Sequence, residues 1–202
     1  MSARQTSKPS LYGLVLAGGK SRRLGHDKGL IEWLGKPQRY YLADLLARHC
    51  VCAYISCRPD QVGQIEEYEA ISDIYPDLGS YGALLSAMSH YPDKSWLVVA
   101  CDMPFVDDDA IDNLIKQRDA QKLATAYFNP ENGLPEPMLA IWEPTAFDRL
   151  VRLSKAGLDC PRKALIKFGD EANLVRPHRA ETIININTPA DKAAAEEALA
   201  SK

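Results

Sequence analysis

The sequence has 202 residues, of which 46% are hydrophobic and 25% are charged. This length and composition are typical of a globular chain with one sizeable core, and they exclude a disordered or fibrous protein. The formal net charge of -3 implies no general attraction to nucleic acid or to an anionic membrane, so an anionic ligand must be held by local cations.

The N-terminus and the cysteines further restrict the class of protein and its expected location. No apolar run is long enough to span a bilayer, and residues 1–10 are polar without a hydrophobic signal segment. We therefore expect a flexible N-terminus over residues 1–10, a single domain over residues 11–202 and a cytoplasmic location. The cysteines contain no Cys-x-x-Cys pair, which predicts reduced thiols rather than a disulfide framework or a zinc site. They are Cys50, Cys52, Cys57, Cys101 and Cys160.

The apolar run Leu11–Leu16 predicts a strand that leads directly into a loop rich in glycine and cations. Gly18 and Gly19 allow the backbone to approach a ligand closely, so that consecutive N–H groups can converge on oxyanions. The cations of the loop can supply positive charge to a triphosphate. They are Arg22, Arg23 and Lys28. Taken alone, the glycine pair favours an ordinary turn with a solvated cationic face, because short glycine motifs occur by chance.

Between residues 35 and 90 the pattern alternates between helix and strand. Pro37 suits the first position of a helix, and the apolar residues after it recur at helical spacing. Short β-like runs then alternate with polar turns. The expected elements are a helix that ends near His49, a strand at Val51–Ser56, a brief helical stretch through Tyr68, a strand at Ala70–Asp73, a long turn at Pro76–Gly82 and a helix capped by Ser80 that runs through Met88.

The continuous apolar run Trp96–Ala100 predicts a central strand of a parallel sheet that is covered on both faces. Asp102 follows it at the mouth of the sheet, where a carboxylate is unfavourable unless a cation neutralises it. Magnesium prefers such oxygen ligands, although a turn or helix-capping role for Asp102 stays open on these grounds. Asp107–Asp109 is expected to begin a helix rather than to form a metal cluster, because acidic residues stabilise a helix start.

The second half of the chain is less regular. Two strands are expected at Leu123–Phe128 and Met138–Trp142, paired antiparallel across a turn-rich loop at Pro130–Pro137. The remaining expected elements are helices at Thr145–Ser154 and Pro161–Phe168, a strand at Thr182–Ile186, and a final helix capped by Thr188 with Pro189 in its first turn. This pattern predicts an α/β fold with a mostly parallel mixed sheet. Because such sheets bind ligands outside the carboxyl ends of their strands, the glycine loop and Asp102 are expected to share one crevice.

Three further polar residues are candidates for the same crevice. Ser56 and Asp73 follow short strands and could contact a base or a ribose, although Ser56 is equally well explained as an ordinary turn residue. Arg162 begins a helix, where the helix dipole disfavours a cation. This unfavourable position is a hint that Arg162 has a function. An ordinary solvent-exposed side chain explains the position about equally well.

The string Leu16-Ala17-Gly18-Gly19-Lys20-Ser21-Arg22-Arg23-Leu24-Gly25-His26-Asp27-Lys28 resembles the signature of nucleotidyltransferases with a Rossmann-like glycosyltransferase-A fold, with Leu24 in place of the usual Met. Together with Cys101–Pro104 and Asn185–Pro189, it resembles the molybdenum cofactor guanylyltransferases from Leu11 to about Asp191. These enzymes join GMP from GTP to molybdopterin and release pyrophosphate. The resemblance implies a single three-layer α/β/α Rossmann-like domain, with Mg2+ assisting an in-line attack on the α-phosphorus of GTP.

The resemblance also implies roles for individual positions. Arg23, Lys28 and Asp102 would be catalytic, with Asp102 as the Mg2+ ligand. The nucleotide would be bound by Leu16, Ala17, Gly18, Gly19, Lys28, Ser56, Asp73 and Asp102. The molybdopterin side would be formed by Gly79, Arg162, Asn185 and Asn187.

Two alternatives stay open. A cytidylyltransferase of the same fold would act on molybdopterin with CTP, and a non-catalytic accessory protein would bind nucleotide and serve molybdoenzymes. The expected substrates are GTP and molybdopterin, with transient contacts to the proteins that donate the cofactor or receive it. Neither nucleic acid nor a membrane is an expected partner.

Overall fold

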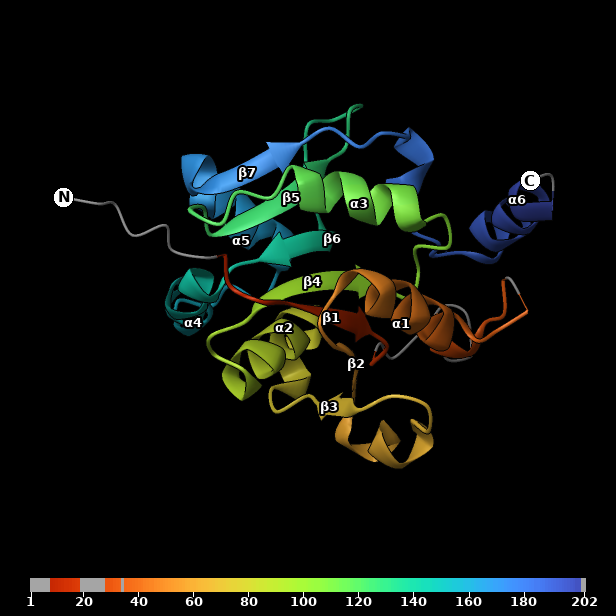
Figure 1. Cartoon of the computed structure of the whole chain (residues 1–202), viewed down its shortest axis with the longest axis horizontal. Helices are drawn as coiled ribbons and strands as arrows, with labels where there is room; N and C mark the ends of the chain where they lie inside the picture. The colour runs from red at the N-terminus through yellow and green to blue at the C-terminus, as the bar shows by residue number, and fades with distance from the viewer. Residues whose placement is uncertain (1–7, 19–27, 34, 201–202) are drawn as a thin grey trace.

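The computed structural model describes residues 8–18, 28–33 and 35–200 (Figure 1). Its strands are β1 (Leu11–Leu16), β2 (Ala53–Cys57), β3 (Ala70–Ser72), β4 (Ser95–Ala100), β5 (Ala124–Phe128), β6 (Pro135–Trp142) and β7 (Ala172–Val175). They form one seven-stranded sheet in the order β3-β2-β1-β4-β6-β5-β7. β6 runs antiparallel to its neighbours β4 and β5, whereas the other neighbouring pairs are parallel. The prediction of a mostly parallel mixed sheet is therefore confirmed.

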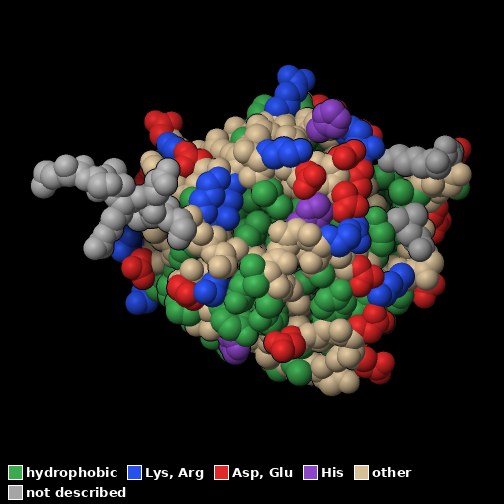
Figure 2. Space-filling view, viewed as in Figure 1, with side chains coloured by type: hydrophobic (Ala, Val, Ile, Leu, Met, Phe, Trp, Pro, Cys, Tyr) green, Lys and Arg blue, Asp and Glu red, His purple; other side chains and the backbone are tan. Residues whose placement is uncertain are grey.

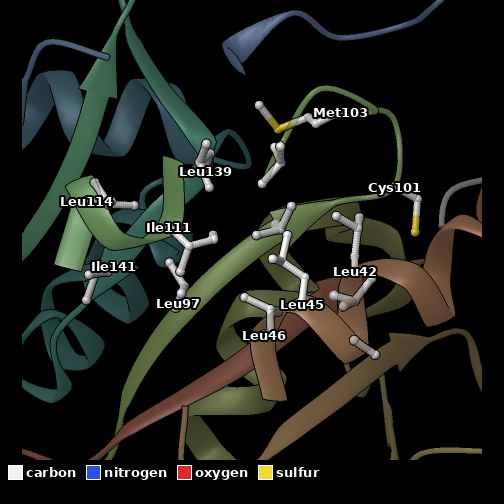
Figure 3. Close-up of a cluster of buried hydrophobic side chains, with 14 of the residues drawn as sticks. Leu42, Leu45, Leu46, Leu97, Cys101, Met103, Ile111, Leu114, Leu139 and Ile141 are labelled. Atoms are coloured by element: carbon white, nitrogen blue, oxygen red, sulfur yellow. The ribbon is translucent and has the colours of Figure 1, made fainter. Parts of the chain in front are cut away.

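Two layers of helices enclose this sheet. α1 (Gln38–His49) and α3 (Asp108–Lys116) bury apolar side chains against one face. Figure 3 shows the leucines of α1 and the apolar residues of α3 on either side of Leu97 from β4. α2 (Gly79–His90), α4 (Phe147–Lys155) and α5 (Pro161–Phe168) bury theirs against the opposite face. The described chain thus has the three α/β/α layers that were predicted.

Local sequence explains where several of these elements lie. All six residues of β4 are buried, as expected for a central strand covered on both faces. α3 begins after Asp107, whose carboxylate accepts a hydrogen bond from the Ala110 N–H at 3.0 Å. The acidic run therefore starts a helix, as predicted. The last helix, α6 (Pro189–Ala200), begins in the same way, because the Thr188 hydroxyl accepts from the Asp191 N–H at 3.1 Å.

The predicted cap of α2 is wrong. A short 3-10 helix at Pro76–Leu78 runs directly into α2, so Ser80 lies inside the first turn instead of capping it. Gly82 explains the tight entry, since a Cβ atom at that position would lie 2.1 Å from the carbonyl oxygen of Tyr75. Only glycine lets the helix pack this closely on the preceding backbone.

The predicted strand at Thr182–Ile186 is also wrong. Residues 180–183 form a 3-10 helix, and the last strand of the sheet is β7, which pairs parallel with β5. Two of the three isoleucines that suggested a strand, Ile183 and Ile186, are buried by loop packing instead, whereas Ile184 is exposed. Ile183 joins the α1 face of the core, and Ile186 packs with Phe105 and Ala195 of α6.

β6 begins earlier than predicted. Its first residue is Pro135, inside the segment expected to be a turn-rich loop. A register shift in the pairing with β5 opposes Tyr127 to Glu136 and Phe128 to Pro135. A proline at the start of a strand is compatible with this pairing. The extension carries Glu136 to the edge of the sheet where the parallel strands end.

The other end of β6 carries a buried ion pair. Arg118 binds Glu143 through two bonds, Nε to Oε1 at 2.6 Å and Nη2 to Oε2 at 2.9 Å. The Ser95 hydroxyl donates to the same Oε2 at 2.6 Å, and Arg118 also donates to the Pro9 carbonyl at 3.1 Å. The Arg118 and Glu143 side chains are only 6% and 1% exposed. This network ties the residues before β1 and the start of β4 to the end of β6.

The surface and the cysteines add two observations. Figure 2 shows basic and acidic side chains interspersed on the face that carries α1 and α3. All five cysteines are thiols. Among the described helices, none combines the length and the apolar character that a membrane span requires.

Candidate active site

The carboxyl ends of β2, β1 and β4 lie side by side. Leu16 is level with Ser56 on one side and with Ala100 on the other. The ladder continues one step past the strands, because the Ala17 N–H donates to the Ser56 carbonyl at 2.9 Å and the Cys101 N–H donates to the Leu16 carbonyl at 3.3 Å. The chain leaves β1 toward β2 on one side, while β4 lies on the other. This is the topological switch point at which α/β sheets bind ligands.

The glycine loop leaves β1 against the end of β2. A Cβ atom at Gly18 would lie 3.3 Å from the backbone nitrogen of Arg58, so glycine allows an approach that another residue would crowd. The Arg58 guanidinium donates to the Gly18 carbonyl at 3.2 Å and also binds Asp60. Arg58 was not among the predicted site residues. Its position in the polar turn after the predicted strand Val51–Ser56 was the signal that could have identified it.

Part of the predicted phosphate loop lies outside the described residues. Gly19 and Arg23 belong to residues 19–27, so their predicted roles stay predictions. Lys28 begins the 3-10 helix Lys28–Leu30, which leads toward the start of α1. Leu16 and Ala17, predicted to contact the nucleotide, lie at the strand end described above.

Asp102 stands at the carboxyl end of β4, next to the end of β1. One of its carboxylate oxygens, Oδ1, is buried. Its backbone carbonyl accepts a hydrogen bond from the Ile186 N–H at 2.8 Å. This bond brings the segment 185–187 to the strand end, although the two parts are distant in sequence. Two residues predicted for opposite substrates, Asp102 and Asn185, therefore belong to one edge of the molecule.

Ser56 and Asp73 lie at neighbouring strand ends but are deeply placed. Ser56 is 1% exposed, and Asp73 is 7% exposed. Asp73 Oδ1 accepts from the Tyr75 N–H at 2.8 Å and from the Ser86 hydroxyl at 3.0 Å, so it orders the turn between β3 and α2. Asp73 therefore has a structural role that the sequence did not predict. Contact of either residue with a base or ribose stays a prediction.

Glu136 is the acidic residue at this edge that sequence analysis missed. Its Oε1 accepts from the Met138 N–H at 2.9 Å, and its Oε2 accepts from Arg162 Nη2 at 3.1 Å and from Asn185 Nδ2 at 3.2 Å. Burial raises the pKa of the Glu136 carboxyl, and the negative charge of Asp102 adds to the rise, whereas the three hydrogen-bond donors oppose it. Glu136 thus joins two residues that were predicted separately for the molybdopterin side.

Gly79 and Asn187, the other residues predicted for the molybdopterin side, have no hydrogen bond to Glu136 among those found in the described residues. Gly79 begins α2 with a φ of 54°, a backbone conformation that favours glycine. Asn187 is exposed, and its backbone N–H donates to the Asp191 carboxylate at 3.0 Å. Their roles in binding molybdopterin stay predictions.

Two hollows border the edge that carries Asn185. One has a volume of about 330 Å3 and is lined by polar side chains that include Glu136, Arg162 and Asn185. The other has a volume of about 460 Å3 and lies against α6, where Phe105, Ile184 and Ile186 make it largely apolar. The polar hollow is of the size that takes a small-molecule ligand.

A mostly parallel sheet whose first strand leads into a glycine loop, with a carboxylate at the switch point, is typical of nucleotide-binding α/β proteins. Comparison with known proteins gives the family. Residues 13–194 match the family described as the MobA-like NTP transferase domain, and the chain belongs to this family of nucleotidyltransferases. The family prediction made from the glycine-loop string is confirmed.

Individual relatives agree with this family. The chain is 36% identical over 187 residues to the molybdenum cofactor biosynthesis bifunctional protein of Synechocystis, covering 92% of this chain but only 53% of that protein. It is 30% identical over 190 residues to the molybdenum cofactor guanylyltransferase of Xanthomonas euvesicatoria, covering 88% and 89% of the two chains. The crystal structure of molybdopterin-guanine dinucleotide biosynthesis protein A from Archaeoglobus fulgidus is 25% identical, with a TM-score of 0.78 over 95% of this chain and 100% of that chain.

Proposed function

We propose that this chain transfers GMP from GTP to molybdopterin and releases pyrophosphate. Membership of the nucleotidyltransferase family supports this proposal, as do relatives named as molybdenum cofactor guanylyltransferases over most of both chains. The observation that carries it is the hydrogen bond from the Ile186 N–H to the Asp102 carbonyl. That bond joins the segment 185–187 to the backbone of Asp102, and this supports a proposal in which acceptor and nucleotide are bound next to each other.

The proposed reaction is an in-line displacement, and positioning supplies much of the catalysis. The glycine loop, including Gly18 and Gly19, would cradle the triphosphate with backbone N–H groups, and Arg23 and Lys28 would bind its negative charge. Ser56 and Asp73 would lie by the base and ribose. An acceptor phosphate oxygen would attack the α-phosphorus while the bond to pyrophosphate breaks. No covalent intermediate on the protein is needed.

Asp102 fits the ligand of a magnesium ion. A carboxylate at a strand end beside the proposed phosphate site supplies the oxygen ligand that magnesium prefers, and magnesium binds through one or two carboxylates together with phosphate oxygens. When bound, Mg2+ would offset negative charge on the phosphates of GTP and of the departing pyrophosphate. Asp102 would thus hold the donor phosphates in place on the β4 side of the crevice.

The decisive experiment is a nucleotide panel. The purified protein is incubated with Mg2+, molybdopterin and each nucleoside triphosphate in turn, and the dinucleotide product is measured. We expect product with GTP. Product with CTP and none with GTP would identify a cytidylyltransferase instead. The absence of any product from competent molybdopterin would contradict a transferase role.

An Asp102→Asn variant separates an enzyme from a nucleotide-binding accessory protein. The substitution keeps the shape of the side chain and removes its charge. We expect turnover to fall at least a hundredfold, because charge stabilisation around the transferred phosphate is lost. A wild-type protein that binds GTP but shows no turnover would be the accessory protein.

The proposed partners are the proteins that supply molybdopterin and the molybdoenzymes that receive the product, through transient contacts. The proposed location is the cytoplasm, where the five cysteines would stay reduced.

A further inference from the structure

Glu136 is a buried carboxylate that no part of the proposed mechanism uses. It lies near the start of β6, the antiparallel neighbour of β4. Val99 of β4 is level with Leu139 of β6, and Glu136 lies three residues nearer the start of β6, toward the edge of the sheet where β4 ends. Its side chain is 6% exposed. A buried carboxylate is unfavourable without partners, so its contacts define its role.

The two oxygens of Glu136 have different partners. Oε1 is held by the N–H of Met138 in the same strand, which fixes the direction of the carboxylate. Oε2 accepts from Arg162 of α5 and from Asn185 of the segment after η6 (Ala180–Ile183). A single oxygen therefore links two elements that approach from different parts of the chain.

Arg162 has a second anchor in the same strand. Its Nε donates to the Pro135 carbonyl at 3.0 Å, while its Nη2 donates to Glu136. These two bonds set the plane of the guanidinium. The side chain is nevertheless 43% exposed, so it is held without being enclosed. A guanidinium with a fixed plane and a free outer side is suited to an oxyanion.

Glu136, Arg162 and Asn185 all line the polar hollow of about 330 Å3. The carboxylate is the buried member, and the guanidinium and the amide stand around it. Negative charge on Glu136 would repel an anionic ligand, so Glu136 is suited to ordering the donors rather than to binding the anion itself.

We propose that Glu136 is a positioning residue that holds Arg162 and Asn185 in place for the phosphate of the acceptor. This inference rests on the proposed function, and it adds a residue that acts through two others. Without Glu136, the guanidinium and the amide lose their shared anchor and must be ordered by the substrate. The affinity for the acceptor then falls, while the binding of GTP at the glycine loop does not change.

The test compares Glu136→Gln and Glu136→Ala with wild type. Gln keeps one oxygen acceptor, and Ala keeps none. We expect the KM for molybdopterin to rise about tenfold in the first variant and up to about a hundredfold in the second, because hydrogen bonds to charged groups are lost. The KM for GTP should stay within about twofold. Fluorescence titration of molybdopterin without nucleotide should show the same order of affinities.

Two control variants make the same Glu→Gln substitution in other Glu–Arg pairs of the protein. Glu143→Gln alters the other buried Glu–Arg pair of β6, and Glu171→Gln alters an exposed pair with Arg149. Neither should change the KM for molybdopterin in folded protein, with the folded fraction checked by thermal unfolding. A purely structural role for Glu136 predicts instead that both substrates are affected equally.

A double-mutant cycle with Arg162→Ala tests whether Glu136 acts through Arg162. We expect the change in KM for Glu136→Ala with Arg162→Ala to be smaller than the product of the two single changes. The inference would be overturned if the KM change of the double variant equalled the product of the two single changes, or if Glu136→Ala left the KM for molybdopterin unchanged. Either result would leave the proposed function intact. A wild-type protein without turnover would overturn the proposed function and this inference together.

Discussion

The two ends of β6 carry the same kind of ion pair in opposite surroundings. At one end, Arg118 and Glu143 are 6% and 1% exposed and are joined by two short bonds, with Ser95 and Pro9 as further partners. At the other end, Glu136 is also buried, with 6% of its side chain exposed, but its arginine, Arg162, is 43% exposed and meets it through one bond. Both members of the first pair are buried, whereas the arginine of the second pair is exposed to solvent.

The difference shows what each pair is built for. A buried arginine whose Nε and Nη2 are directed at protein groups, as in Arg118, is suited to holding the fold together. An arginine with an anchored plane and an exposed outer side can also bind a ligand. Breaking the Arg118–Glu143 pair should therefore lower the free energy of unfolding more than breaking the Arg162–Glu136 pair. Water can replace the lost partner only where the arginine is exposed.

Arg118→Met should give the largest effect on stability. It leaves the Glu143 carboxylate buried with the Ser95 hydroxyl as its main partner. Removal of one partner from a buried pair lowers the free energy of unfolding by about 3 to 5 kcal/mol. Urea unfolding monitored by circular dichroism measures this loss.

The matched control is Arg118→Met combined with Glu143→Leu. Because the double variant buries no charge, we expect it to be more stable than Arg118→Met alone. A double variant that is less stable than the single variant would show that the pair itself, rather than the orphaned carboxylate, stabilises the fold.

Arg162→Lys should have a small effect on stability and a clear effect on activity. Lysine keeps the charge but has one nitrogen, so it cannot bind the Pro135 carbonyl and Glu136 in the same planar arrangement. We expect the free energy of unfolding to change by less than about 1 kcal/mol, because water reaches the exposed side chain. The KM for molybdopterin should rise about tenfold. Equal losses in urea unfolding and in acceptor affinity would remove the distinction between the two ends of β6.

Asp108→Asn should give the smallest effect, because both partners of this third pair are exposed. Arg48 and Asp108 are 52% and 56% exposed, and the hydrogen bond from Arg48 is the main cause that lowers the pKa of Asp108. A lowered pKa means that the pair stabilises the fold above the usual aspartate value of 3.8 and that this contribution is lost as the pH falls through the folded-state value. Solvent and salt screen the pair, so the loss at neutral pH should be below about 1 kcal/mol.

Urea unfolding of wild type and Asp108→Asn at neutral pH and near pH 2 checks this direction. The difference between the two proteins should disappear at low pH, where both side chains are uncharged. A difference that persists there would have a cause other than the ion pair.

The sequence predicted best what depends on local pattern. The apolar runs of β1 and β4, the helix at Pro161–Phe168 and the cap at Thr188 all follow from residues that lie close together in the chain. The neighbouring positions of the β1 and β4 strand ends, which lead to Gly18 and to Asp102, followed from a general rule about parallel sheets. These features needed no knowledge of distant contacts.

Glu136 could not be predicted in this way. Its segment contains several prolines and reads as a loop, and only the register of β6 against β4 and β5 brings it to the site. The isoleucines at 183, 184 and 186 favour a strand by propensity, yet tertiary packing buries Ile183 and Ile186 on different clusters. The missed features are those set by contacts between remote parts of the chain.

The antiparallel direction of β6 determines which part of this site can change in sequence without disturbing the rest. The turn between β5 and β6 is closed by the Asn129 N–H to the Leu134 carbonyl at 2.8 Å, and Asn129, Asn132 and Leu134 line the polar hollow. The two strands fix both ends of this turn. Insertions or substitutions within it would therefore reshape one wall of the hollow while the β1 and β4 strand ends stay in place. Under the proposed function, the part that would select an acceptor is thus separate from the part that would handle the nucleotide, and each could change without the other.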